Sequence, residues 1–350
     1  MRIDRTGGRR RRFPIPRSLF PAVLLLTLAG CGSGDGTGDA VRFTVPRGSG
    51  MSSVADTLDR RGIIGSPGIF KAYARMKGQA ARLQPGVYEV RPGASFDVIL
   101  RKLTTGDVVK TRLVIPEGWE LRRIAPRLAA VTGQPADSVL SRLMDPAQAR
   151  KYGVPGPTLE GYLYPATYVF PMGVGLDAIL RELTGQYKRA WTPQMRARAQ
   201  ALGMSEREVV TLASIVEKEA KVWSERPTIA RVYHNRLQRG MRLEADPTVQ
   251  YALGEHQRRL LQRHIQETAD DPYNTYRNKG LPPGPIASPS RGAIEATLNP
   301  ADHAFLFCVA RANGTHVLTR TYAEHLREVA RYRAEMRAQR QQQAPPPAGR

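Results

Sequence analysis

The stretch Val209–Ala220 reads V-V-T-L-A-S-I-V-E-K-E-A, an apolar run that ends in two glutamates and contains neither glycine nor proline. On a helical wheel with Leu212 as the reference, Glu219 lies about 20° away, in the middle of the apolar stripe. Glu217 lies about 140° away, on the other side of the same wheel. The stretch therefore predicts a core helix whose two glutamates point in different directions.

A carboxyl group on an apolar helix face has two interpretations. Glu219 can lie at the rim of a core helix, where it reaches water or pairs with an arginine. Alternatively, burial raises its pKa, because desolvation disfavours the charged carboxylate. A carboxyl with a raised pKa is what a general acid working near neutral pH requires. Ser205 followed by Glu208 matches a capping box, so we expect the helix to begin just after Ser205.

Short strands and helices alternate along the whole chain, which predicts an α+β fold. Residues 41–112 begin with a strand, two helices and a second strand. This β-α-α-β order resembles a LysM-type module, a small fold that commonly binds glycans containing N-acetylglucosamine, although a general α+β adaptor has the same order. A mixed α+β domain is expected over 113–336. The expected strands span 41–45, 86–90, 109–115, 305–310 and 316–319, and the expected helices besides that of Glu219 span 52–61, 67–76, 95–103, 120–131, 137–144, 176–202 with a break at 192–193, 224–237, 290–298 and 321–336.

Residues 1–31 resemble a bacterial lipoprotein signal. Arginines are concentrated before an apolar run from Leu19 to Leu28, and Leu28-Ala29-Gly30-Cys31 ends the run. In this interpretation Cys31 becomes the lipidated N-terminus, because the run is shorter than a membrane span of about 20 residues. An uncleaved anchor over 13–30 and a chance match are the alternatives. With either anchor, everything beyond Cys31 is expected outside the inner membrane, in the periplasm.

The formal net charge of +22 at pH 7 suits an anionic partner such as nucleic acid, a lipid surface or an acidic polymer. The predicted export disfavours nucleic acid. Two cysteines and six histidines are spaced like no known metal site, so we expect no metal and no cofactor. If Cys31 is acylated, Cys308 has no partner for an internal disulfide. A flexible linker is expected over 32–40 and a disordered tail over 337–350.

A series of short motifs beyond residue 113 carries a resemblance to a known family. The motifs are, in order, E-G-Y-L-Y-P-A-T-Y (160–168), A-S-I-V-E-K-E (213–219), N-R-L (235–237), G-M-R-L (240–243), D-P-T-V-Q-Y (246–251), Y-N-T-Y (273–276) and G-L-P-P-G-P-I (280–286). Together they closely resemble the MltG/YceG-like endolytic murein transglycosylases, from about Leu113 to Tyr332. The family carries a LysM-like domain at the place of residues 41–112.

The resemblance implies that the protein cuts the β-1,4 bond between N-acetylmuramic acid and N-acetylglucosamine inside nascent peptidoglycan strands. The cut strand then ends in 1,6-anhydro-N-acetylmuramic acid, so no water is consumed and elongation stops. The family's essential glutamate is the second of its E-K-E, which falls on Glu219, the residue that the helical wheel also selects. Peptidoglycan strands, inner-membrane lipid and peptidoglycan synthases are the implied partners.

One acid is enough for this chemistry. A glycosidase that uses water normally needs two carboxylates, whereas a lytic transglycosylase uses the C6 hydroxyl of its own sugar as the nucleophile. We expect Glu219 to protonate the leaving oxygen and then to accept the C6 hydroxyl proton, and we expect Glu217 to be dispensable. The alternatives are a water-using muramidase, with Glu160 or Asp246 as the second carboxylate, and a non-catalytic scaffold that binds peptidoglycan.

Four further residues of the motifs have both a functional and a structural interpretation. Asp246 either stabilises developing oxocarbenium charge or only caps a turn. Tyr162 and Tyr164 either stack on sugar rings or fill the core. Glu160 is a candidate second carboxylate, although a structural role fits it better.

Polar residues of three other motifs are candidates for hydrogen bonds in the cleft. Asn274, Thr275 and Tyr276 can bond to N-acetyl or hydroxyl groups of the glycan. Arg242 and Asn235 are expected to hold the cleft together through hydrogen bonds to its carboxylates.

Overall fold

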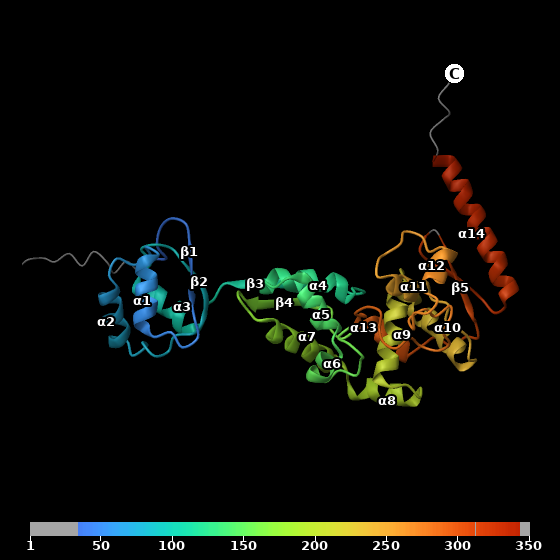
Figure 1. Ribbon diagram of the computed structural model, residues 1–350, viewed down its shortest axis with the longest axis horizontal. Helices are drawn as coiled ribbons and strands as arrows, with labels where there is room; N and C mark the ends of the chain where they lie inside the picture. The colour runs from blue at the N-terminus through green and yellow to red at the C-terminus, as the bar shows by residue number, and fades with distance from the viewer. Residues whose placement is uncertain (1–33, 312, 344–350) are drawn as a thin grey trace, which may run out of the picture. The chain divides into compact units, whose positions relative to one another are not determined.

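The chain forms two compact units in the computed structural model, which describes residues 34–311 and 313–343, with side chains up to residue 337 (Figure 1). The smaller unit is built mainly from residues before 107, and the larger one from Asp107 onward. The expected signal and Cys31 lie outside the described residues. Among the helices that are described, none combines the length and the apolar character needed to cross a membrane.

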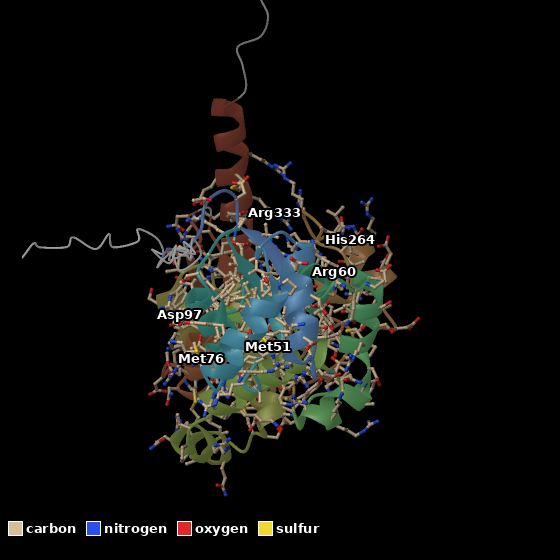
Figure 2. All side chains as sticks on the ribbon, turned by 90° about the vertical axis from the view of Figure 1, so that its left-hand side faces the viewer. Met51, Arg60, Met76, Asp97, His264 and Arg333 are labelled. Atoms are coloured by element: carbon tan, nitrogen blue, oxygen red, sulfur yellow. The ribbon has the colours of Figure 1, made fainter. Side chains whose placement is uncertain are left out.

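The smaller unit has the predicted β-α-α-β order, followed by a third helix. Its two strands pair with each other in a sheet of their own. The side chains of Phe43, Leu58 and Phe70 are buried in its core, while Met76 lies on its surface (Figure 2). The α+β character is thereby confirmed, and glycan binding by a LysM-like module stays a prediction. The elements are β1 (Val41–Val45), α1 (Met51–Arg60), α2 (Pro67–Met76), β2 (Gly86–Val90) and α3 (Phe96–Thr105).

The first half of the larger unit packs helices around an antiparallel pair of strands. Strand β3 pairs with strand β4, which places Ile115 opposite Ala166. Strand β4 and helix α6 were not predicted, because the prolines around them suggest a loop, and because only a partner far away in sequence makes β4 a strand. The elements are β3 (Lys110–Ile115), α4 (Leu121–Thr132), α5 (Ala136–Met144), α6 (Pro146–Tyr152), β4 (Ala166–Pro171), α7 (Leu176–Ala190) and α8 (Pro193–Ala201).

The second half of the larger unit ends in a β-hairpin and a long helix. The hairpin was predicted, and it pairs Cys308 with Leu318. The last helix was expected to end near residue 336, but it continues to Gln343, since the segment is rich in the good helix formers alanine, arginine and glutamine. The elements are α9 (Glu206–Glu219), η1 (Trp223–Glu225), α10 (Arg226–Gln238), α11 (Asp246–Leu253), α12 (Gln262–Glu267), which was not predicted, α13 (Arg291–Leu298), β5 (Phe307–Ala310), β6 (His316–Thr319) and α14 (Tyr322–Gln343).

Helix α9 is the central helix of the larger unit, and it packs against α8, α10, α11 and α13. The capping box is confirmed: the Glu208 amide donates to Ser205 Oγ at 3.3 Å, and the Ser205 amide donates to Glu208 Oε2 at 2.8 Å. All residues from Val209 to Val216 are buried. The helix is therefore enclosed around its whole circumference, rather than on one apolar face as the helical wheel suggests.

Candidate active site

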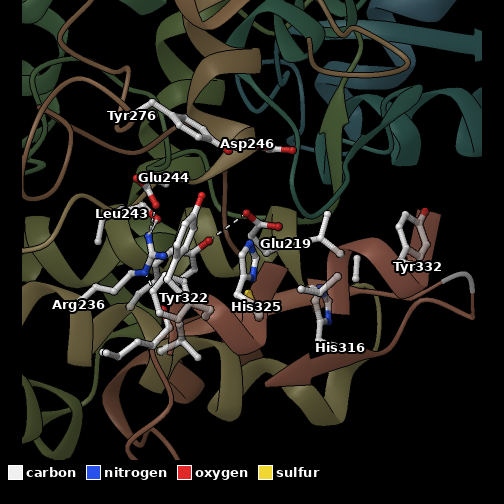
Figure 3. Close-up of a pocket in the computed structure, with 18 residues that line it drawn as sticks. Glu219, Arg236, Leu243, Glu244, Asp246, Tyr276, His316, Tyr322, His325 and Tyr332 are labelled. Atoms are coloured by element: carbon white, nitrogen blue, oxygen red, sulfur yellow. Dashed lines mark hydrogen bonds and ion pairs between the residues drawn. The ribbon is translucent and has the colours of Figure 1, made fainter. Parts of the chain in front are cut away.

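Glu219 is the last residue of α9, and its carboxyl group reaches the surface of a cavity (Figure 3). The Tyr233 hydroxyl, from α10, donates a hydrogen bond to Glu219 Oε1 at 2.9 Å. Burial, with a further contribution from the charge of Asp246, raises the pKa of Glu219 to about 7, against the opposing effect of the Tyr233 hydrogen bond. The carboxyl group can thus carry a proton near neutral pH and still ionise without a large free-energy change.

Asp246 stands at the start of α11, on the same cavity as Glu219 (Figure 3). The N-cap of this helix is Ala245, and the Asp246 side chain instead accepts a hydrogen bond from the Tyr276 hydroxyl at 2.6 Å. Asp246 was expected either to cap a turn or to act on the substrate. Because its side chain makes no cap hydrogen bond, the capping interpretation is wrong, and its carboxylate is held next to Glu219 by Tyr276.

Two cavities meet at Glu219 and Asp246. The main cavity has a volume of about 450 Å³, and the side cavity one of about 200 Å³. Both are lined by Glu219, Asp246, Ala310 and His316, so the two carboxylates lie where the cavities join. A long ligand can therefore extend in two directions from the Glu219 carboxyl group.

Aromatic side chains from the hairpin and from α14 form one wall of the main cavity. The Phe307 ring lies 5.9 Å from the Tyr322 ring and 5.3 Å from the His325 ring, measured between centroids. Tyr332 of α14 also lines the main cavity (Figure 3). Flat apolar ring faces of this kind suit the hydrophobic faces of sugar rings. This wall was not predicted from the sequence, since no motif covers the residues that form it.

Arg236 fixes the turn that leads into α11. Its guanidinium group is buried and donates to the Glu244 carboxylate at 3.0 Å, to the Leu243 carbonyl at 2.8 Å and to the Arg242 carbonyl at 2.9 Å. Glu244 has a φ of 49° and is the one residue other than glycine with a positive φ in the described part of the chain. This backbone strain is held by Arg236 at the edge of the main cavity, two residues before Asp246.

Glu217 has partners of its own inside the protein. Its Oε1 lies 2.8 Å from Arg226 Nη2, and both side chains are almost fully buried. Its Oε2 accepts hydrogen bonds from the Ser290 amide and hydroxyl, and Arg226 also donates to that hydroxyl at 2.8 Å. Glu217 therefore joins the end of α9 to the starts of α10 and α13, and it lines neither of the two cavities.

Sequence comparison adds to this geometry. A profile of the YceG-like family matches residues 43–331. The chain belongs to the YceG-like family. Over 311 residues it is 33% identical to the endolytic murein transglycosylase of Bacillus subtilis strain 168, covering 83% of this chain and 84% of the relative. Over 322 residues it is 29% identical to the endolytic murein transglycosylase of Streptococcus pneumoniae serotype 2 strain D39, covering 83% of this chain and 58% of that longer relative.

The fold of this YceG-like chain is similar to that of a solved relative. The crystal structure of a yceG-like protein from Listeria monocytogenes is 34% identical and superposes with a TM-score of 0.57. The similarity covers 83% of this chain and 98% of that structure. The α+β architecture predicted from the sequence is thus a property of the family.

Three of the candidate glycan-binding residues are too deeply buried to touch a substrate. Tyr162 is 0% exposed and packs edge-to-face on Tyr187 at 5.1 Å, so its core interpretation is correct. Asn274 is 0% exposed, and its amide donates to the carbonyls of Ile265 and Thr268. Thr275 accepts from the Ala245 amide at 3.0 Å, and so it holds the turn before Asp246 rather than the glycan.

Four other candidates also lie away from the two cavities. Tyr164 packs against the core that surrounds β3 and β4. Asn235 donates to the backbone carbonyls of His303 and Phe305, not to a carboxylate. Arg242 is exposed, and the expected contact to a carboxylate is made by Arg236 instead, because the buried guanidinium needs a counter-charge.

Glu160 is the fourth of these candidates. Both of its carboxylate oxygens accept from the Leu121 amide, at 3.2 and 3.1 Å, so that it caps α4. Burial raises its pKa to about 8, against the lowering effect of this hydrogen bond. It is buried and lines neither cavity, which favours the structural role expected for it over that of a second carboxylate.

Proposed function

We propose that this YceG-like protein is an endolytic lytic transglycosylase of peptidoglycan. It cuts the bond between N-acetylmuramic acid and N-acetylglucosamine within nascent strands and leaves a 1,6-anhydro-N-acetylmuramic acid end. The relatives named endolytic murein transglycosylase support this reaction class. The observation that carries the proposal is a single carboxyl group with a pKa of about 7, Glu219, at the junction of two cavities.

In the proposed reaction Glu219 acts twice. Its protonated carboxyl first donates the proton to the glycosidic oxygen, and the bond from that oxygen to C1 of the muramic sugar breaks. The C6 hydroxyl oxygen then bonds to C1, and the Glu219 carboxylate takes the hydroxyl proton. The acid is regenerated and no water enters the balance. Tyr233 supports the carboxylate between the two steps, since its hydroxyl donates to Oε1.

Asp246 supplies negative charge to the same site in this mechanism. Its carboxylate is held by the Tyr276 hydroxyl and faces the main cavity. There it stabilises the positive charge that develops on the sugar ring as the C1 bond breaks. It also helps to keep Glu219 protonated, because a neighbouring negative charge disfavours a second one.

A water-using muramidase is the second candidate function. The main cavity is lined by Asp246 and Glu219 and by Glu244, which is paired with Arg236. A second carboxylate beside Glu219 favours this function, with Glu219 as the acid and Asp246 as the base or nucleophile. The two reactions differ in their products, because an anhydro end is lighter than a reducing end by one water. Mass spectrometry of the released glycans therefore decides between them.

The decisive experiment is digestion of peptidoglycan by the purified protein and by its Glu219→Gln variant. We expect the variant to release anhydro-ended glycans about 10²- to 10⁴-fold more slowly, which is the usual contribution of a general acid. Glu295→Gln is the matched control, because Glu295 is an exposed glutamate paired only with Arg291. Release by Glu219→Gln at the wild-type rate would refute the assignment. Binding without any cleavage by the wild type would favour a scaffold.

The proposed location is the outer side of the inner membrane. Cys31, as a lipidated N-terminus, would hold the protein there, with synthases as neighbours and the module over 41–112 as an additional glycan contact. Mass spectrometry of the N-terminal peptide distinguishes the two anchors. A chain that begins at a lipidated Cys31 supports the lipoprotein, and a chain that retains residues 13–30 indicates the uncleaved anchor instead.

A further inference from the structure

The side cavity next to Glu219 is lined by three cationic side chains. Lys218 comes from the last turn of α9, Lys221 from the segment after it, and Arg311 from the end of β5. Glu219 and Asp246 are the two carboxylates that line this cavity, and both lie at its junction with the main cavity. The part of the side cavity away from the catalytic carboxyl is therefore positively charged.

Part of this positive charge has no counter-charge in the protein. Lys218 Nζ lies 3.2 Å from Glu120 Oε1, and an Arg311 nitrogen lies 3.7 Å from a carboxylate oxygen of Glu328. Lys221 is exposed and forms no ion pair with the residues that the structure describes. Its ammonium group is thus available to an anionic ligand that enters the side cavity.

The main cavity has a different character. Among the described residues, Arg236 is the one arginine or lysine that lines this cavity. Its charge is paired with Glu244. The rings of Phe307 and Tyr322 line the cavity together with other aromatic and with aliphatic side chains. The main cavity therefore suits uncharged sugar rings, whereas the side cavity suits an anion.

The proposed substrate carries such an anion next to the bond that is cut. The muramic sugar bears a lactyl group on O3, and in nascent strands this group is extended by a peptide that contains free carboxylates. Any sugar placed for protonation by Glu219 brings this peptide to the mouth of one of the two cavities. Lysine can bind a carboxylate as a compact point charge with three donors.

We propose that the side cavity binds the acidic stem peptide of the muramic residue at the cleaved bond, with Lys221 as the principal contact. This inference rests on the proposed function. It makes Lys221 a specificity-determining residue: the protein distinguishes strands that carry peptides from strands whose peptides have been removed.

The test compares two substrates that differ only in the peptide. Glycan strands are prepared with their stem peptides, and a portion is stripped by an amidase. We expect wild-type kcat/KM to be higher on the peptide-bearing strands by about tenfold, the usual effect of one charge-assisted contact. Lys221→Glu should bring the ratio of the two kcat/KM values close to one, and Lys221→Arg should largely restore it. Lys188→Glu, an equal charge change at an exposed position of α7, should keep the wild-type ratio.

Binding provides a readout that does not depend on cleavage. In the Glu219→Gln background the Kd for soluble peptide-bearing fragments should rise about tenfold when Lys221→Glu is added, and the Kd for stripped fragments should change much less. Equal effects on both substrates, or a wild type without preference, would overturn the inference. If the wild type cuts neither substrate while the Kd values still differ in this way, the proposed reaction fails and the peptide site stands.

Discussion

At the scale of single residues, the protonation state of Glu219 should control the rate. Its pKa is raised to about 7 by burial and by Asp246. Since the proposed reaction begins from the protonated form, kcat/KM should fall about tenfold per pH unit above pH 7. A profile of kcat/KM between pH 5 and pH 9 measures this limb. An acidic group with an ordinary pKa would place the same decline near pH 4.5, the value from which the Glu219 pKa is raised.

Substitutions of Asp246 and Tyr233 should shift the alkaline decline of kcat/KM in opposite directions along the pH axis. Asp246 raises the pKa of Glu219, and the Tyr233 hydrogen bond lowers it. Asp246→Asn should therefore shift the decline of kcat/KM to lower pH, and Tyr233→Phe should shift it to higher pH. The measurement is the same pH profile for each variant. A common shift of both variants in one direction would show that Glu219 is not the group that titrates.

The residue scale is also where the sequence was most informative and most misleading. A helical wheel and a family motif both select Glu219, and the structure places this residue on a cavity. The burial of Asn274 and Thr275 could not be predicted, since a polar side chain whose partners are backbone groups looks in sequence like one that faces a ligand. Tyr233 lies outside the quoted motifs, and Arg236 lies within N-R-L (235–237) but was not singled out as a site residue. The packing of α10 on α9 brings both to the site.

At the scale of elements, the end of α9 is held by the buried pair of Glu217 and Arg226. Glu217→Gln should lower the free energy of unfolding by about 3–5 kcal/mol, because it leaves a buried guanidinium without its counter-charge. Urea unfolding measures the loss. Glu295→Gln breaks an exposed ion pair and should change the value by less than about 1 kcal/mol.

Because Glu217 stabilises the fold, cleavage by the Glu217→Gln variant has to be interpreted together with its stability. The sequence suggests that Glu217 is dispensable, so that its glutamine variant would cleave normally. In the structure, Glu217 holds α9 against α10 and α13. Reduced cleavage by Glu217→Gln would therefore reflect a loss of folded protein rather than a loss of catalysis. If the Glu217→Gln variant has the same free energy of unfolding as the wild type, Glu217 is not needed for stability and remains dispensable, as the sequence suggests.

Elements with local signals were predicted well, and those made by distant pairing were not. The capping box at Ser205 fixed the start of α9 from four residues of sequence. Strand β4 forms only by pairing with β3. The wall of the main cavity forms only where the hairpin and α14 pack near α10 and α11. Such contacts join segments that carry no shared periodicity, so the cavities themselves could not be predicted.

At the scale of the whole molecule, the site should reduce stability at alkaline pH. The folded state holds the Glu219 proton more tightly than the unfolded state, since the pKa rises from 4.5 to about 7. The free energy of unfolding therefore declines as the pH rises through this window. Glu219→Gln should be more stable than the wild type by about 1–3 kcal/mol at pH 8, and the difference should shrink at pH 5. Thermal unfolding at the two pH values measures it; an unchanged difference would contradict the pKa shift.

The position of Glu219 at the end of a helix has a consequence for repeated turnover. In the proposed reaction, a proton must leave the Glu219 carboxyl group toward one oxygen and return from another within the same catalytic cycle. Helix α9 is enclosed by four other helices and tethered at Glu217, so the carboxyl group has little freedom to follow either oxygen. In the proposed reaction we therefore expect the sugar ring to move toward a stationary acid. Ligands that mimic such a distorted ring should bind more tightly than relaxed ones.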